Sequence, residues 1–293
     1  MTMPELPAAD IRRAVRLALE EDLGQGDLTT SALFQSAVPA RARIVAQQPL
    51  VVAGMAAAVQ TFLAVDASLI LAVLKKDGAQ ALNRETILRI EGDGRSILMA
   101  ERIALNFLQQ LSGIATLTQR FRRAVDGRVA ILDTRKTIPG WRSIQKWAVA
   151  LGGGTNHRHS LGDGILVKDN HLKLLKPKHG VLEACRLARQ RGPSGMQVIV
   201  EAESLKEVAQ AVAGLADIVL LDNMTPAMVK KAIRLINGRA LVEVSGGITL
   251  DNVRAMAAAK PDRISIGALT HSAPAATLTL ELERAVPGRQ KRR

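Results

Sequence analysis

Two adjacent cations, Arg135 and Lys136, follow the short apolar segment 129–132 after only Asp133 and Thr134. Positive charges at the end of a buried strand are unfavourable unless an anion accompanies them. Arginine offers a planar pair of donors to a carboxylate or a phosphate, whereas lysine acts as a mobile point charge. The segment therefore predicts an anion site, with an ordinary surface loop as the alternative.

A second basic segment, 152–158, combines three glycines with His157 and Arg158. The glycines allow the backbone to approach a ligand closely, although a helix cap and a connector would also explain them. Further along, Lys168 ends another apolar segment, where it could bind a phosphate or form a Schiff base. The neighbouring Arg158 and His171 favour the anion site.

The carboxylates Glu201 and Asp222 follow two further apolar segments. Carboxylates are unexpected in an anion pocket unless a positive group lies between them. A phosphate-bound Mg²⁺ and a sugar ring that develops positive charge are two such groups. Ion pairs with nearby lysines are the structural alternative. Glu203 is expected to cap the helix that Ser204 and Leu205 begin.

Glycines follow the last two apolar segments of the series. Ser245, Gly246 and Gly247 form the first group, and Gly267 begins the second, four residues before His271. In α/β barrels the loops at these places often form a phosphate cradle from backbone N–H groups and a helix N-terminus. Either motif alone is weak, but the two on successive strands predict a phosphate site.

The elements that must position these residues follow a regular alternation. Six apolar segments are expected to be strands, at 129–132, 165–167, 197–200, 218–221, 241–244 and 263–266. Helical patterns lie between them, at 143–150, 181–189, 205–212, 226–236 and 250–259. The alternation predicts a parallel sheet wrapped into an α/β barrel. The residue after each strand then lies at one rim, where the active sites of such barrels are found.

The first third of the chain predicts an α+β unit instead. A helix is expected to begin at Asp10, which would cap it, and another near Ser96. Two β-like segments and the helical stretch between them are expected at 43–52, 86–90 and 56–64.

The composition narrows the class of ligand. Forty Lys and Arg face 27 Asp and Glu, which gives a formal charge of +13 that attracts anions of several kinds. Aromatic residues make up 2% of the chain, too few for the stacking surfaces of single-strand nucleic-acid binders. Part of the excess charge lies in 288–293, which is expected to be a solvated terminus. No nucleic-acid partner is therefore expected.

Cys185, the one cysteine of the sequence, is expected to be a buried structural thiol. The first residues lack the basic start and apolar run of a signal peptide. No apolar stretch reaches the ~20 residues that a membrane span needs. A cytoplasmic protein with no membrane partner is expected.

Taken in order, these motifs resemble the quinolinate phosphoribosyltransferase family, also called nicotinate-nucleotide pyrophosphorylase (carboxylating). The early segments that carry the resemblance are EDLGQGDLTT at 21–30, AERIALN at 100–106 and LSGIAT at 111–116. The later ones are TRK at 134–136, GGGTNHR at 152–158, KDNH at 168–171, LDN at 221–223, SGG at 245–247 and GALTH at 267–271. One departure is His159-Ser160, where the family usually has an apolar residue and a glycine. His159 is then either a loop variation or an extra contact near the pocket.

The resemblance implies an α/β fold with two domains. An N-terminal open α/β sandwich, residues 1–112 joined by 272–293, would precede an irregular, incomplete α/β barrel of six or seven strands, residues 113–271. The resemblance also implies a homodimer in which Arg102 reaches into the neighbouring site.

The implied reaction is phosphoribosyl transfer from phosphoribosyl pyrophosphate to quinolinate with decarboxylation, which yields nicotinate mononucleotide, pyrophosphate and CO₂ for NAD biosynthesis. Quinolinate would be bound by Arg102 of the neighbour, Arg135, His157, Arg158 and Lys168. The phosphoribosyl donor would be bound by Lys136, Lys168, Glu201, Asp222, Ser245, Gly246, Gly267 and His271, and Thr134 and Gly247 belong to the same substrate-binding motifs. Lys136, Glu201 and Asp222 are the expected catalytic residues, and Mg²⁺ is the expected cofactor, assisted by Glu201 and Asp222.

Three alternatives stay open at the level of sequence. A related transferase acting on nicotinate would not require a second carboxylate, and the cations Arg102, Arg135, Arg158 and Lys168 exceed the need of a single one. A basic nucleic-acid-binding module would show salt-sensitive binding without turnover. An aldolase that forms a Schiff base on Lys168 would be trapped by borohydride.

Overall fold

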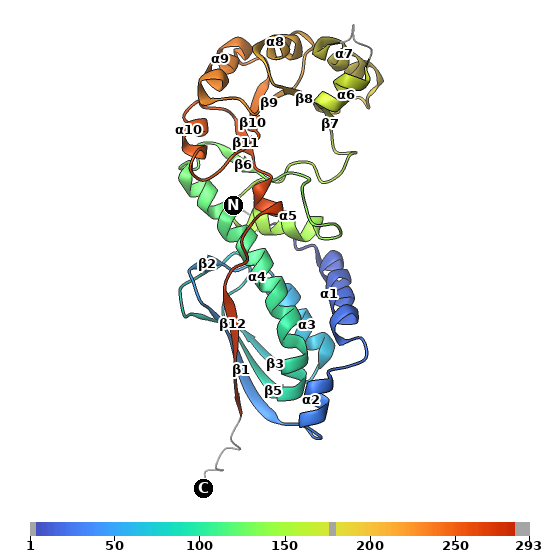
Figure 1. Cartoon of the computed structure of the whole chain (residues 1–293), viewed down its shortest axis with the longest axis vertical. Helices are drawn as coiled ribbons and strands as arrows, with labels where there is room; N and C mark the ends of the chain where they lie inside the picture. The colour runs from blue at the N-terminus through green and yellow to red at the C-terminus, as the bar shows by residue number, and fades with distance from the viewer. Residues whose placement is uncertain (1–3, 176–179, 285–293) are drawn as a thin grey trace. The chain divides into compact units, whose positions relative to one another are not determined.

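The computed structural model describes residues 4–175 and 180–284 (Figure 1). The segment 288–293, expected to be a solvated terminus, lies outside the described residues. The chain divides into two compact units, of which the first comprises 1–117, 138–152 and 273–293 and the second 118–137 and 153–272. The expected barrel domain, 113–271, included 138–152, which this division groups with the first unit.

The first unit is built on a four-stranded antiparallel sheet in the order β12-β1-β5-β3. These strands are β1 (Pro39–Ala46), β3 (Ile70–Val73), β5 (Thr86–Asp93) and β12 (Leu278–Arg284), and a separate pair consists of β2 (Leu50–Val51) and β4 (Gln80–Ala81). The β-like segment expected over 43–52 is divided between β1 and β2, whose residues pair in different sheets. Pro49, which has no N–H to donate to a ladder, lies between the two strands.

Helices cover one face of this sheet (Figure 1). The helices that begin in this unit are α1 (Ala8–Leu23), α2 (Leu28–Leu33), α3 (Met55–Val65), α4 (Gly94–Ala124) and α5 (Arg142–Leu151). Alternate residues of β1, namely Ala40, Ala42 and Ile44, are buried in one core cluster with residues of α3 and α4. Asp10 does not cap α1, because the helix begins earlier. It lies in the first turn and pairs with Arg13 (2.9 Å).

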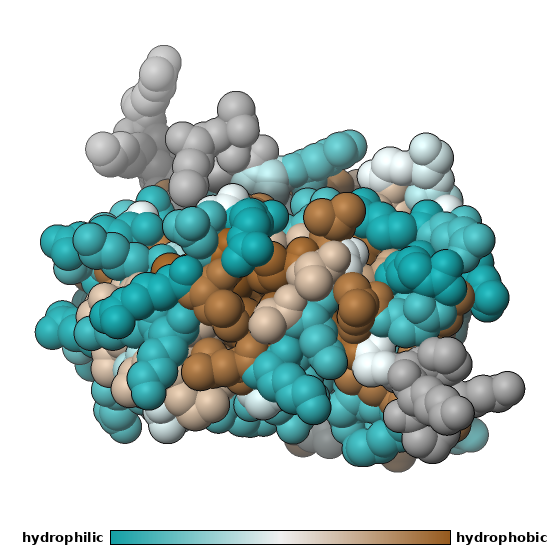
Figure 2. All heavy atoms as spheres, turned by 90° about the horizontal axis from the view of Figure 1, so that it is seen from above, coloured by the Kyte–Doolittle hydropathy of each residue, from teal (hydrophilic) through white to brown (hydrophobic). Residues whose placement is uncertain are grey.

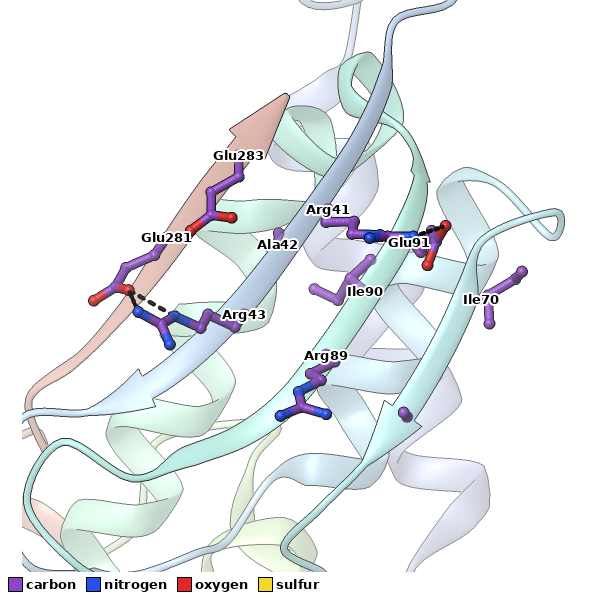
Figure 3. Close-up of a pocket in the computed structure, with 10 residues that line it drawn as sticks. Arg41, Ala42, Arg43, Ile70, Arg89, Ile90, Glu91, Glu281 and Glu283 are labelled. Carbon is purple, nitrogen blue, oxygen red and sulfur yellow. Dashed lines mark hydrogen bonds and ion pairs between the residues drawn. The ribbon is translucent and has the colours of Figure 1, made fainter. Parts of the chain in front are cut away.

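The opposite face of the sheet carries charged side chains (Figure 3). Arg41 lies beside Glu91 (3.1 Å) and Arg43 beside Glu281 (2.7 Å), and in each pair the two residues are direct cross-strand partners. The same alternation that buries the alanines of β1 directs its arginines to solvent. A cavity of about 440 Å³ lies over this face.

The second unit contains a parallel sheet in the order β6-β11-β10-β9-β8-β7. Its strands are β6 (Ala130–Leu132), β7 (Ile165–Val167), β8 (Val198–Ala202), β9 (Ile218–Asp222), β10 (Leu241–Ser245) and β11 (Arg263–Ser265). The six expected strands are confirmed, with ends that differ by at most two residues. Within the described residues the edge strands β6 and β7 do not pair with each other. The expected incomplete α/β barrel is thus confirmed in an open, six-stranded form.

Helices follow the strands of this sheet. They are α6 (Asp169–Leu174), α7 (Val181–Arg191), α8 (Leu205–Ala213), α9 (Pro226–Ile236), α10 (Val253–Ala257) and α11 (Ala268–His271). The helix expected over 250–259 is shorter. It begins after Asn252 and ends before Ala258. Ser204 and Thr225 cap α8 and α9 by accepting hydrogen bonds from backbone N–H groups of the first turns.

The register of the parallel strands arranges their inward side chains in layers. Ser245 is the partner of Asp222, and Glu243 is the partner of Leu220. Because alternate residues of a strand share a side, Ser245 and Glu243 face the same way, with Glu243 one layer deeper. The residues of the last layer, which includes Ser245 and Asp222, therefore lie at the rim of the sheet.

Figure 2 shows a face on which hydrophobic residues gather near the middle, among hydrophilic ones. In the part of the chain that the structure describes, no helix is both long enough and apolar enough to cross a bilayer. Cys185 is fully buried in α7, as predicted, and burial raises the pKa of its thiol to about 11.

Candidate functional site

The residues expected to carry chemistry surround one cavity of about 680 Å³ in the second unit, which we call the site cavity. It lies at the carboxyl ends of the parallel strands, since Asp222 and Ser245 are the last residues of β9 and β10. The expected residues that line it are Thr134, Arg135, Lys136, His157, Arg158, Lys168, Glu201, Asp222, Ser245, Gly246, Gly247, Gly267 and His271. The structure thus brings together every predicted site residue except Arg102.

Arg102 lies on α4 in the first unit and is exposed. It lines a different cavity, of about 700 Å³, together with Glu21 and Asp22 of α1. The stacked rings of Phe107 and Trp141, whose centroids are 5.0 Å apart, line the same cavity. The role of Arg102 in a neighbouring site stays a prediction.

Arg135 and Arg158 form a pair of cations in the wall of the site cavity. The Nε atom of each is buried and has no hydrogen-bond partner among the described residues. The Nη1 of Arg158 donates to the carbonyl of Gly164 (2.8 Å), which fixes that guanidinium. Burial lowers the pKa of Arg158, and the positive charge of Arg135 lowers it further. Two adjacent cations with unused donors favour an anion with more than one acceptor group.

Lys136 is held through its backbone, which leaves its side chain to the cavity. Its N–H donates to Oγ1 of Thr134 (3.0 Å), and Oγ1 of Thr270 donates to its carbonyl (2.7 Å). A Cβ at Gly267 would lie 3.0 Å from both Cδ of Lys136 and Nε2 of His271. Glycine at this position is therefore what allows these two side chains to approach the loop after β11.

The loop after β10 also depends on glycine. Gly246 and Gly247 both have left-handed backbone angles, with φ of 88° and 59°. A Cβ at Gly246 would lie 2.7 Å from the backbone nitrogen of Asn223, which donates to the carbonyl of Ser245 (3.0 Å). Among the described residues, the helices after β10 and β11 are short, so a phosphate cradle here would use loop N–H groups.

Two of the residues that line the site cavity, Glu201 and Asp222, belong to a group of three carboxylates. Glu201 is buried and its Oε2 lies 2.5 Å from Nζ of Lys168. Burial raises the pKa of Asp222, and the negative charge of Glu201 raises it further. A lysine ion-paired in this way is arranged as a binding cation rather than as a nucleophilic amine, which disfavours the Schiff-base alternative.

Glu203 is the third carboxylate of this acidic group, and its place there was not predicted from the sequence. Ser204 caps α8, and the backbone N–H of Glu203 donates to the carboxylate of Glu207 (2.8 Å), so the expected capping role of Glu203 was wrong. Carboxylate oxygens of Glu201, Glu203 and Asp222 can all lie within 4.8 Å of one another. Such a set of oxygen donors fits Mg²⁺, which binds carboxylates and phosphates.

Asn223 and Glu243 are among the residues of the cavity wall that were not predicted as site residues. Asn223 donates to Oδ2 of Asp222 (2.7 Å). Glu243 is fully buried and contacts His157, whose Nε2 lies 3.3 Å from Oε1. A charged residue inside the apolar segment 241–244 was the available signal. The backbone N–H groups of His159 and Ser160 both donate to Asp163, and neither residue lines the site cavity.

Comparison with known families gives a match along most of the chain. Residues 114–281 match the C-terminal domain of quinolinate phosphoribosyl transferase, and residues 27–112 match its N-terminal domain.

Individual relatives agree with these matches. A protein of Methanocaldococcus jannaschii, named probable nicotinate-nucleotide pyrophosphorylase (carboxylating), is 38% identical over 282 residues, which cover 93% of this chain and 97% of that protein. A Bacillus subtilis protein of the same name is 38% identical over 263 residues, covering 89% and 90%. The solved nicotinate-nucleotide pyrophosphorylase of Francisella tularensis is 34% identical, with a TM-score of 0.89 over 97% of this chain and 99% of that one.

Proposed function

The chain belongs to the quinolinate phosphoribosyltransferase family, and we propose on this basis that it transfers a phosphoribosyl group from phosphoribosyl pyrophosphate to quinolinate. Pyrophosphate and CO₂ leave, and nicotinate mononucleotide is formed for NAD biosynthesis. The observation that carries the proposal is the pair Arg135 and Arg158, with two buried Nε donors left unused in the site cavity. Quinolinate has carboxylates on adjacent ring carbons, and these match two adjacent guanidinium groups.

The two substrates divide the site cavity between them. Arg135 and Arg158 bind the carboxylates of quinolinate, with Lys168 nearby. Lys136, His271 and the glycine loops after β10 and β11 bind the phosphates of the donor. These loops offer backbone N–H groups without side chains that would keep a phosphate away.

The acidic side of the cavity serves the sugar. The pyridine nitrogen forms a bond to C1 of the ribose while the bond from C1 to pyrophosphate breaks, and positive charge develops on the sugar ring. Glu201 and Asp222 stabilise that charge, because they are already placed and partly desolvated. Lys136 and Lys168 offset the negative charge of the departing pyrophosphate.

Decarboxylation follows from the charge of the product. The ribosylated ring nitrogen is cationic, so it stabilises the electron pair that remains on the adjacent ring carbon when the carboxylate departs as CO₂. A proton from solvent then replaces that carboxylate on the ring. The chain contributes by holding the remaining carboxylate on its arginines.

Mg²⁺ is part of the proposal. Glu201, Asp222 and Glu203 would hold it, and its chemistry would be to neutralise charge on the pyrophosphate. Turnover is measured with and without a chelator, and each measurement is compared with the same reaction after Mg²⁺ has been added. The comparison tests whether turnover depends on the ion. Full activity after exhaustive metal removal would exclude the ion.

The direct test of the function is turnover of the purified chain. Quinolinate, phosphoribosyl pyrophosphate and Mg²⁺ should yield nicotinate mononucleotide and CO₂ in equal amounts. Nicotinate in place of quinolinate is the matched control, and we expect it to be a poor substrate because it carries one carboxylate. Failure of a folded protein to form product from quinolinate would refute the proposal. Preferential use of nicotinate would favour the related transferase.

We also propose a homodimer in which Arg102 acts in the neighbouring site. Arg102→Ala and Lys136→Ala are each expected to be inactive as homodimers. Hybrid dimers of the two variants would contain one site that carries neither substitution, so mixing should restore part of the activity. A mixture as inactive as its components, with subunit exchange verified, would contradict a shared site. A cytoplasmic location is proposed as well and is tested by cell fractionation.

A further inference from the structure

Glu243 is a charged residue at a place where a charge needs strong compensation. It lies in the middle of β10, and its side chain is 0% exposed. Its partner on the neighbouring parallel strand is Arg263, whose Nε lies 2.8 Å from Oε2. The contact is close but poorly aligned as a hydrogen bond, so it acts as a charge contact. Burial opposes the charge of Glu243, but His157, Arg263 and Ser265 together hold its pKa below the ordinary value.

The ring of His157 has both nitrogens occupied by the protein. Nδ1 accepts a hydrogen bond from the backbone N–H of Arg158 (2.7 Å), so this nitrogen carries no proton. Nε2 lies 3.3 Å from Oε1 of Glu243, and a carboxylate there requires the proton to be on Nε2. These two contacts therefore place the proton of the His157 ring on Nε2. No ring nitrogen is left to contact a substrate carboxylate.

The contacts of His157 determine the position of Arg158. The backbone N–H of His157 donates to Oδ1 of the buried Asp133 (2.8 Å), and its ring receives the N–H of Arg158. The chain entering Arg158 is thus tied to the end of β6 through Asp133 and to β10 through Glu243. These ties, with the bond to Gly164, fix the direction of the Arg158 guanidinium.

We propose that Glu243, balanced by Arg263, is a positioning residue that orients His157 and thereby aims Arg158 at a carboxylate of the substrate. This inference rests on the proposed function. It changes the role of His157, which acts on the substrate through Arg158 instead of through its own ring. It also explains why an apolar strand carries a glutamate one layer below the rim.

The first test is spectroscopic and uses the unmodified protein. Long-range ¹H–¹⁵N spectra of the imidazole groups, with His157 assigned from its missing signals in His157→Gln, should show a neutral ring protonated on Nε2 at pH 7.5. An imidazolium, or a ring protonated on Nδ1, would overturn the inference. This measurement does not depend on turnover, so it separates failure of the anchor from failure of the proposed function.

The second test compares two variants with the same net charge. Glu243→Met with Arg263→Met removes the ion pair and the acceptor for Nε2, whereas Glu243→Gln with Arg263→Met keeps an acceptor. We expect the first variant to raise KM for quinolinate roughly tenfold while KM for phosphoribosyl pyrophosphate changes less than about twofold. The second variant should restore KM for quinolinate to near its original value.

The control is Ile218→Val, which removes a buried methylene from β9 and changes no charge or hydrogen-bonding group. It should lower Tm without altering either KM. A purely structural role for Glu243 would predict that both double variants resemble this control. Equal KM values for quinolinate in the two double variants would therefore refute the positioning role. If the first variant does not fold, the spectroscopic result alone decides.

Discussion

The outer face of the sheet in the first unit and the site cavity in the second use the same residue types in opposite ways. On the sheet face, Arg41 and Arg43 are exposed and lie beside glutamates that the strand register places opposite them (Figure 3). In the site cavity, Arg135 and Arg158 are close to one another, and their Nε atoms are buried without a partner. Both regions are cavities lined by arginine and glutamate.

The two regions differ in the groups that compensate the positive charge of their arginines. Exposed arginines are compensated by water and by neighbouring carboxylates, so their ion pairs contribute little to stability. Buried guanidinium groups without partners are unfavourable until an anion supplies the missing acceptors. The number of charges in a cavity therefore says less about ligand binding than the number of buried donors left unused.

The largest effect that would separate the two regions is on turnover. Arg135→Ala should lower kcat/KM for quinolinate roughly a thousandfold, because a buried, charge-assisted contact to the substrate is lost. Its Tm should stay the same or rise, since one of two repelling cations is removed. Arg89→Ala, on the sheet face, is the matched control and should leave turnover unchanged. A Tm loss in Arg135→Ala without a selective loss of turnover would make Arg135 structural and would break the comparison.

A second effect concerns Asp222, whose pKa burial and then Glu201 raise. The folded protein holds this proton more tightly than the unfolded chain. The group therefore favours folding below its ordinary pKa of 3.8 and loses that contribution as pH rises through the raised value. Asp222→Asn should lower turnover about a hundredfold. In metal-free buffer it should raise Tm at pH 7.5, and the gain should shrink towards pH 4.

Thermal unfolding across that pH range checks the prediction. A Tm that falls at pH 7.5, or a gain that grows on acidification, would contradict the assigned direction of the shift. Glu281→Gln, on the sheet face, is the control and should change Tm little at either pH.

The smallest effect is expected for the ion pair of Arg43 and Glu281. Arg43→Ala, Glu281→Ala and the double variant should each change Tm by less than about 2 °C, because both side chains are accessible to solvent. Turnover should not change in any of them. Strong coupling between the two substitutions in Tm would show that the exposed pair matters more than its surroundings suggest.

Much of the second unit could be predicted from the sequence because each strand is short, apolar and followed by a polar residue or glycine. This alternation of apolar segments and polar residues predicted both the strands and the rim of the sheet. Glu201, Asp222 and Ser245 were therefore expected at one cavity, and all three line it. Local sequence was sufficient here, because parallel strands that end together bring their following residues together.

Other features depend on contacts between distant segments. Glu243 was hidden in an apolar segment, and only the register of β10 with β11 reveals Arg263 as its counterion. Glu203 was predicted to cap a helix, but Ser204, one residue later, is the residue that caps it. The break between β1 and β2 was missed because each half is β-like and only pairing in different sheets separates them.

The pairing of β12 with β1 has a consequence for synthesis on the ribosome. Ala40 is paired with Arg284, so the first unit cannot complete its sheet until residue 284 has been translated. The six strands of the second unit emerge before that moment, and their sheet can assemble first. Until β12 arrives, β1 presents an unpaired edge to other nascent chains. A chain truncated before residue 278 should therefore be prone to aggregation through its N-terminal half, even though the site cavity would be intact.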